Sequence, residues 1–188
     1  MSLGVPEFET ARLWMRGWRD EDREPFARMN ADPHVMEHFP SLVSREESDA
    51  MIERIGQRFA EQGFGLWALE RKDNGEFIGF TGLNVPRFEE WFTPCVEIGW
   101  RLAFEAWGQG FASEAARRAL AYGFEAVHLE KIVSFTSIPN VRSQRVMQRI
   151  GMRHEPAWVF EHPSVSEGSP LRTHLLYEIR REQFDPET

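Results

Sequence analysis

Three strand-like segments follow one another closely in the middle of the sequence. They cover residues 65–70, 77–85 and 96–103, and each has the apolar, β-branched and aromatic content of a half-buried or buried strand. Asp73-Asn74-Gly75 separates the first two segments, and Asn and Gly readily adopt the positive φ of a tight hairpin turn. This arrangement predicts an antiparallel meander at the centre of the fold.

The flanking sequence alternates between strand and helix patterns. Residues 12–18 (RLWMRGW) predict a first strand, and the acidic run 19–22 precedes a helix that ends near residue 30. Ser44 and Glu47 form a capping-box pattern at the start of a second helix. Further on we expect a long helix over 112–127, a buried strand over 131–138, a short helix over 141–150 and two final strands over 157–161 and 173–180. The whole predicts one α/β (α+β) domain over residues 1–188, with a core at about 8–184.

Composition excludes several classes of function. A length of 188 residues suits one domain. A net charge of −8 argues against a nucleic-acid partner. Cys95 is the single cysteine, which rules out an internal disulfide and a cysteine zinc cluster, and we interpret it as structural. No signal-peptide pattern opens the sequence and no apolar run has the length of a membrane span, so we expect a cytoplasmic protein without a membrane partner.

A glycine-containing loop, Trp107-Gly108-Gln109-Gly110-Phe111-Ala112, joins the third strand of the meander to the long helix. Glycines before a helix allow a tight turn that exposes successive backbone N–H groups, and these groups together with the helix dipole favour a phosphate or pyrophosphate. The loop lacks the Gly-Lys-Ser/Thr of a Walker motif and the third glycine of a dinucleotide fingerprint. We therefore expect an anion site of another kind, although the same glycines also suit a turn with no ligand.

This loop resembles the motif of the Gcn5-related N-acetyltransferase (GNAT) family, which reads Arg or Gln, two residues, Gly, one residue, then Gly or Ala. Gly110 and Ala112 match it, whereas Trp107 departs from the first position. The Trp-Gly-Gln-Gly-Phe-Ala-Ser-Glu-Ala string is similar to the ribosomal-protein N-terminal acetyltransferase branch (RimJ/RimL type), where an aromatic residue is usual here. Asn140 and Ser143, followed by Gly151-Met152, resemble that branch's Asn, two residues, Ser, then Gly-Phe signature. The resemblance covers most of the chain.

The resemblance implies a central mixed, mostly antiparallel sheet that splays between its fourth and fifth strands and is flanked by about four helices. The fourth strand is then residues 96–103. It also implies acetyl-CoA as co-substrate, with pantetheine in the splay, no metal and no covalent enzyme intermediate. The cofactor-binding residues implied are Trp100 and Leu102 for pantetheine, the backbone of Gly108, Gln109, Gly110, Phe111, Ala112 and Ser113 for pyrophosphate, and Asn140 and Ser143 for CoA or the thioester.

Attack on a thioester requires a neutral amine, yet lysine amines have a pKa of about 10.4 and α-amines about 7.7 to 8.0. A base is therefore needed. Glu97, on the strand expected to hold the thioester, is our first candidate, and Glu161, near the end of the sixth strand, is the second. The family's usual acid, a Tyr about seven residues after the Asn, is replaced here by Met147. Ser143 or a water then remains to protonate the CoA sulfur.

The sequence thus predicts an acetyl-CoA-dependent N-acetyltransferase that acts on a protein N-terminal α-amine or on a small amine, as a monomer or homodimer. Two alternatives stay open: a non-catalytic acyl-CoA-binding sensor or interaction domain, and a nucleotide-binding regulatory domain. We expect the acceptor pocket between the early helices, the strand from residue 65 and the loop from residue 162, with Trp67, Phe88, Trp91 and Phe92 as candidate walls. A large aromatic residue such as Trp67 belongs to the core by default, whereas the aromatic residues of the loop 87–94 are harder to place in a core.

Overall fold

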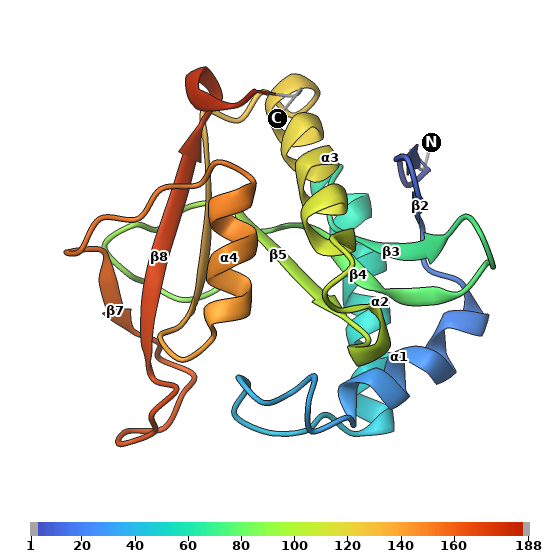
Figure 1. Cartoon of the computed structure of the whole chain (residues 1–188), viewed down its shortest axis with the longest axis horizontal. Helices are drawn as coiled ribbons and strands as arrows, with labels where there is room; N and C mark the ends of the chain where they lie inside the picture. Colours follow the sequence, from blue (N-terminus) through green and yellow to red (C-terminus); the bar gives the residue numbers. More distant parts are fainter. Residues whose placement is uncertain (1–3, 186–188) are drawn as a thin grey trace.

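The computed structural model describes residues 4–185 as one eight-stranded sheet flanked by four α-helices (Figure 1). The strand order is β1-β2-β3-β4-β5-β6-β8-β7. Every neighbouring pair is antiparallel except β5 and β6, which are parallel. The strands are β1 (Phe8–Glu9), β2 (Leu13–Arg16), β3 (Leu66–Arg71), β4 (Phe77–Asn84), β5 (Glu97–Leu102), β6 (Lys131–Ser137), β7 (Val159–Glu161) and β8 (Thr173–Arg180); the helices are α1 (Arg23–Asn30), α2 (Arg45–Gln62), α3 (Phe111–Glu125) and α4 (Val141–Arg149). The predicted mixed, mostly antiparallel sheet is confirmed.

Local signals account for most element boundaries. The Ser44 hydroxyl accepts a hydrogen bond from the Glu47 N–H at 3.1 Å, and the Glu47 carboxylate accepts one from the Ser44 N–H at 2.8 Å. This capping box satisfies two donors that the start of α2 would otherwise leave unpaired. Asp73-Asn74-Gly75 closes the β3–β4 hairpin, with Gly75 at φ 73°. Strand β1 was not predicted, because it has only two residues and exists through its register with β2.

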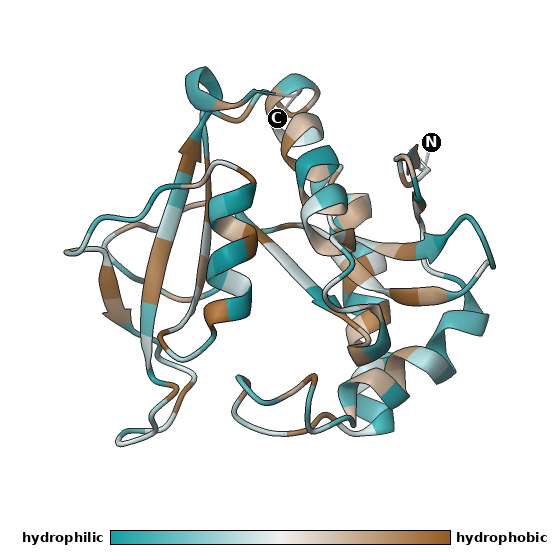
Figure 2. Ribbon diagram, in the orientation of Figure 1, coloured by the Kyte–Doolittle hydropathy of each residue, from teal (hydrophilic) through white to brown (hydrophobic). Residues whose placement is uncertain are grey.

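The apolar side chains form two clusters, of which the larger continues across the sheet to Ile132 on β6, Met147 on α4 and Ile179 on β8. The larger cluster joins β2 to β5 with α1, α2 and α3, and Trp67 and Phe26 lie at its centre with no solvent exposure. The smaller cluster contains Phe92, Val133, Phe160 and Leu176. Polar residues cover α1 and the β3–β4 turn on the outside (Figure 2). Within residues 4–185, every helix is too short or too polar to cross a membrane.

Strands β5 and β6 touch at one end and then diverge. Their register contains one pair, Glu97 with Val133. The Val133 N–H donates to the Val96 carbonyl at 2.9 Å, and the Ser134 hydroxyl donates to the Ile98 carbonyl at 2.8 Å. Beyond these contacts β5 runs with the half of the molecule that holds α1 to α3, away from β7, β8 and α4 (Figure 1). The predicted splay between the fourth and fifth strands therefore lies between β5 and β6.

Candidate active site

Glu97 stands where β5 and β6 part. It is in register with Val133 on one side and with Asn84 on the other. The Asn84 amide donates to the Glu97 carboxylate at 3.4 Å, and the Arg58 guanidinium on α2 donates to the Asn84 amide oxygen. Burial raises the pKa of Glu97 from 4.5 to about 7, against the opposing pull of Asn84 and Arg58. A carboxyl group with that pKa accepts and releases protons near neutral pH, as a general base must.

The loop before α3 presents backbone N–H groups without a side-chain cap. Gly108 and Gly110 have φ of 75° and 83°, a left-handed conformation that glycine adopts freely. Gly110 is the N-cap of α3 and has no side chain to occupy the first N–H groups of the helix. The Arg12 guanidinium donates to the Gln109 carbonyl at 2.8 Å and pairs with Glu114 in the first turn of α3 at 2.7 Å, which fixes the loop against the helix. These donors fit the CoA pyrophosphate that the sequence predicts at residues 108–113.

The backbone of β5 faces the splay at alternate residues. Val96 and Ile98 direct their carbonyls toward β6, so alternation directs those of Trp100 and Leu102 the same way. The Leu102 carbonyl accepts the indole N–H of Trp107 at 2.8 Å. Trp107, the departure from the family motif, therefore closes the turn between β5 and α3. The Trp100 backbone remains available to an amide lying along the splay, as predicted for pantetheine.

Asn140 and Ser143 form the N-terminal cap of α4. The Asn140 amide oxygen accepts the Ser143 N–H at 3.2 Å, and the Asn140 amide nitrogen donates to Thr136 at 2.9 Å and to the Ser143 hydroxyl at 3.2 Å. Both amide hydrogens of Asn140 are thus used within the chain. The Ser143 hydroxyl accepts one bond and keeps its own hydrogen to donate. A role for Asn140 toward CoA stays a prediction, and the cap favours positioning of Ser143.

Glu161, the second candidate base, is tied to other groups on the edge strand β7. Its carboxylate accepts the Thr173 hydroxyl at 2.7 Å and pairs with Arg172 at 3.2 Å, and its side chain is 54% exposed. Phe160, the preceding residue, packs into the smaller apolar cluster, so strand alternation turns Glu161 toward the other face. The structure therefore brings Glu97, and not Glu161, to the point where the strands part.

The two tyrosines and the cysteine are structural. Tyr122 donates its hydroxyl hydrogen to the Gly63 carbonyl at 2.8 Å, and Tyr177 is buried against His154. Burial, with a smaller contribution from Glu97, raises the pKa of the Cys95 thiol to about 11. The thiol is therefore protonated at neutral pH and is a poor nucleophile. Met147, at the position of the usual acid, is buried in the core.

The aromatic residues expected to line a pocket divide into two groups. Trp67 is wholly buried, and its indole N–H donates to the Pro6 carbonyl at 2.7 Å, so Trp67 is a core residue and not a pocket wall. Phe88 and Phe92 pack together with rings from β6 and β7, while Trp91 is 58% exposed. The His162 ring lies against Phe88, and its centre is 4.8 Å from the centre of the His174 ring. Burial, with a contribution from His174, lowers the pKa of His162 to about 4.

The mixed sheet parts between two parallel strands, beside a helix whose N-terminus is capped by glycine, as the resemblance to the GNAT family implies. The sequence model described as "Acetyltransferase (GNAT) domain" matches residues 12–153, and the chain belongs to this family. The chain is an acetyltransferase, which confirms the expectation of an enzyme over that of a sensor domain.

Similar proteins include curated relatives and solved structures. The uncharacterized protein YkkB of Bacillus subtilis is 34% identical over 77% of this chain and 84% of its own. The FsC-acetyl coenzyme A-N(2)-transacetylase of Aspergillus fumigatus is 30% identical over 95% of this chain and 78% of its own. The structure of Mycobacterium smegmatis RimJ in complex with CoA-disulfide superposes with a TM-score of 0.74 at 23% identity, covering 94% of this chain and 87% of RimJ. Ribosomal-protein acetyltransferases are thus among the structural neighbours, which is consistent with the predicted branch.

Proposed function

We propose that the chain transfers an acetyl group from acetyl-CoA to a primary amine, either a protein N-terminal α-amine or a small amine, by direct attack of the amine on the thioester. The observation that carries the proposal is the Glu97 carboxyl, which stands where β5 and β6 part and has a pKa of about 7. Two relatives support it. The name of the Aspergillus fumigatus relative specifies acetyl coenzyme A and a nitrogen, N(2), and RimJ was solved with CoA-disulfide.

Acetyl-CoA supplies the activated acetyl thioester, and the residues of this chain bind it and move protons. The N–H groups of residues 108–113 bind its pyrophosphate at the start of α3. The Trp100 backbone pairs with an amide of the pantetheine arm in the splay. This placement brings the thioester toward the closed end of the splay, beside Glu97.

Glu97 removes a proton from the attacking amine. Asn84 holds the Glu97 carboxylate by a hydrogen bond, and Arg58 holds Asn84. Both therefore orient the base without contacting the substrate. Ser143 donates its hydroxyl hydrogen to the departing CoA sulfur, while Asn140 fixes the hydroxyl oxygen. An α-amine loses its proton at a pH about 2.5 units lower than a lysine-type amine, so turnover of an acceptor with a lysine-type amine should continue to rise to a higher pH.

Release of CoA from acetyl-CoA, followed with a thiol reagent, tests the proposal. The acceptors are N-terminal peptides, polyamines and aminoglycosides, and acetyl-CoA binding is titrated in parallel by calorimetry. We expect release that depends on an acceptor, and its loss in Glu97→Gln with acetyl-CoA binding retained. Glu9→Gln, which alters an exposed carboxylate paired with Lys72 at 2.8 Å, is the control and should behave as the wild type. Absence of acetyl-CoA binding would overturn the proposal.

A further inference from the structure

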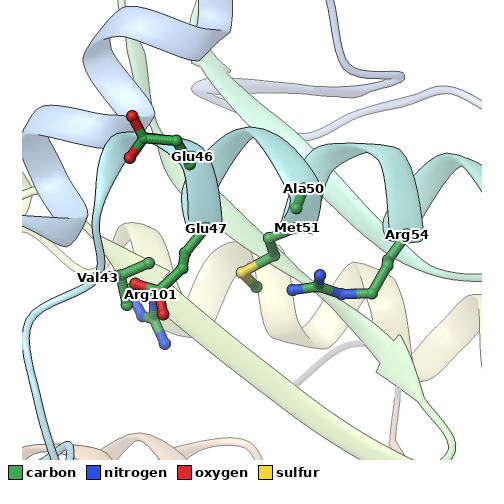
Figure 3. A pocket seen from close by; sticks show the side chains of 7 residues that line it. All are labelled: Val43, Glu46, Glu47, Ala50, Met51, Arg54 and Arg101. Carbon is green, nitrogen blue, oxygen red and sulfur yellow. The ribbon is translucent and has the colours of Figure 1, made fainter.

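A pocket of about 510 Å³ lies between α2 and β5 (Figure 3). Its size is that of a site for a small molecule. Arg101 on β5 lines one side, and Arg54 on α2 extends along the helix toward Met51 on the other. The remaining lining residues are Val43, Glu46, Glu47 and Ala50.

The Arg101 guanidinium is largely buried and only partly satisfied. Its Nη1 donates to the Asn30 amide oxygen at 2.7 Å, and its Cζ lies 4.2 Å from the centre of the Phe39 ring. Its Nε is buried and has no hydrogen-bond partner among the described residues. Burial lowers the pKa of Arg101 to about 10, and no carboxylate opposes that effect. A buried donor without a partner costs free energy, and more so on a charged group.

The edge of the Arg101 guanidinium that includes the unpaired Nε is the one with which arginines bind carboxylates. The Nε and Nη2 hydrogens of an arginine point the same way and match the two oxygens of a carboxylate. In Arg101 the contact with Asn30 uses Nη1 instead. The Nε–Nη2 edge therefore keeps the two hydrogens that a planar anion, once it displaced the groups covering Nε, would receive in parallel hydrogen bonds.

The acidic residues of the pocket do not neutralise its arginines. Within residues 4–185, no carboxylate pairs with Arg54, Arg58 or Arg101 at ion-pair distance. The Glu47 carboxylate is used by the capping box of α2, and the Glu46 carboxylate points away from Arg101 (Figure 3). A chain with a net charge of −8 thus places two arginines without carboxylate partners at ion-pair distance, Arg54 and Arg101, in one pocket.

This pocket and the candidate base lie on one face of β5. Glu97 and Arg101 are four residues apart on the strand, so their side chains share a face and their Cα atoms are about 13 Å apart. Arg54 is one helical turn from Arg58, which reaches Glu97 through Asn84. A molecule that touched Arg101 and Glu97 together would need a spacer of several atoms.

Building on the proposed function, we infer that the acceptor is a small amine that carries a carboxylate several atoms from the amine. The amine lies at Glu97, and the carboxylate binds the Nε–Nη2 edge of Arg101, with Arg54 beside it. An ordinary α-amino acid does not suit this arrangement, because its carboxylate adjoins its amine. The ion pair between Arg101 and the carboxylate should favour a charged acceptor over a neutral one. The expected difference is that of a hydrogen bond to a charged group, which corresponds to about 10- to 100-fold in kcat/KM.

Matched acceptors that differ at one end test the inference. We would compare 6-aminohexanoate, 6-aminohexanamide and 1,6-diaminohexane by acceptor-dependent CoA release. Wild type should prefer the acid over the amide by about 10- to 100-fold. Arg101→Gln should reduce this ratio to near one, and Arg101→Lys should restore it in part, because lysine offers a point charge without the fork. Arg45→Gln, on α2 but paired with Glu24 and Asp49, is the matched control and should keep the ratio.

A second measurement does not depend on turnover or on folding of the Arg101 variants. Calorimetry of the wild-type protein with CoA should show N-acetyl-6-aminohexanoate binding at least tenfold more tightly than its amide. Equal binding would overturn the inference, as would equal use of the acid, amide and diamine in an enzyme that releases CoA. Better use of a peptide starting Met-Glu than of any small amino acid would overturn the assignment to a small acceptor. Failure of acetyl-CoA to bind would instead overturn the proposed function.

Discussion

Replacing Glu97 by Gln should make the protein more stable at alkaline pH while it loses activity. The folded pKa of about 7 lies above the ordinary value of 4.5, because burial disfavours the charged form. Between these two values the folded protein holds a proton that the unfolded chain has released, so the free energy of unfolding falls as pH rises from 4.5 through 7. Each unit of pKa shift corresponds to about 1.4 kcal/mol, so ionisation of Glu97 lowers the free energy of unfolding above pH 7 by about 3 kcal/mol.

Gln cannot ionise and keeps an oxygen that can accept the Asn84 amide hydrogen. We therefore expect wild type and variant to have similar free energies of unfolding near pH 4.5. Above pH 8 the variant should be more stable by about 3 kcal/mol, which corresponds to a rise in Tm of roughly 6–12 °C for a chain of this size. Its kcat should fall by about 100-fold or more, since a general base contributes that much.

Urea unfolding at half-unit pH steps from 4.5 to 8.5 measures the difference in free energy of unfolding, and CoA release measures kcat. Glu9→Gln, which removes an exposed pair with Lys72, should change stability by less than about 1 kcal/mol. A difference between wild type and Glu97→Gln that does not grow with pH would refute the argument that a buried Glu97 ionises at a cost.

Three further predictions follow from the same geometry. First, below about pH 7 the protonation of Glu97 should lower kcat/KM for an α-amine by about tenfold for each pH unit, in addition to the decrease caused by protonation of the amine. In Glu97→Gln only the decrease caused by protonation of the amine should remain. Second, Gly110→Ala should lower the free energy of unfolding by about 1–2 kcal/mol and raise the KM for acetyl-CoA, because residue 110 has φ 83°. By contrast Gly56→Ala, with open space around it on α2, should raise the free energy of unfolding by about 0.5–1 kcal/mol; equal effects of the two substitutions on urea unfolding would contradict this reasoning. Third, Ser143→Ala should lower kcat by about 10-fold or more without weakening acetyl-CoA binding in calorimetry, whereas an unchanged kcat would show that water protonates the CoA sulfur.

Sequence patterns predicted those parts of the fold that neighbouring residues determine. The Ser44–Glu47 capping box, the Asp73–Gly75 turn and the glycine-capped start of α3 are each made within a few residues. The resemblance to a family then supplied the splay, which no local pattern indicates. Even so, the sequence left Trp67 open between the core and a pocket wall, because an aromatic residue in a strand carries no local sign of which face it occupies, and the structure places it in the core.

The candidate site also has features that the sequence predicted and features that only the structure revealed. The sequence by itself determined that Glu97 lies on a strand beside the glycine loop, since both features are read from contiguous residues. Only the tertiary structure decided that Asn84 and Arg58 hold Glu97 and that Arg101 meets Asn30 through Nη1. These contacts join residues 13 to 71 positions apart, and they form because α1 and α2 pack against the face of β4 and β5. Burial on that face, which no residue type specifies alone, is the physical reason that the pKa of Glu97 is raised and that of Arg101 is lowered.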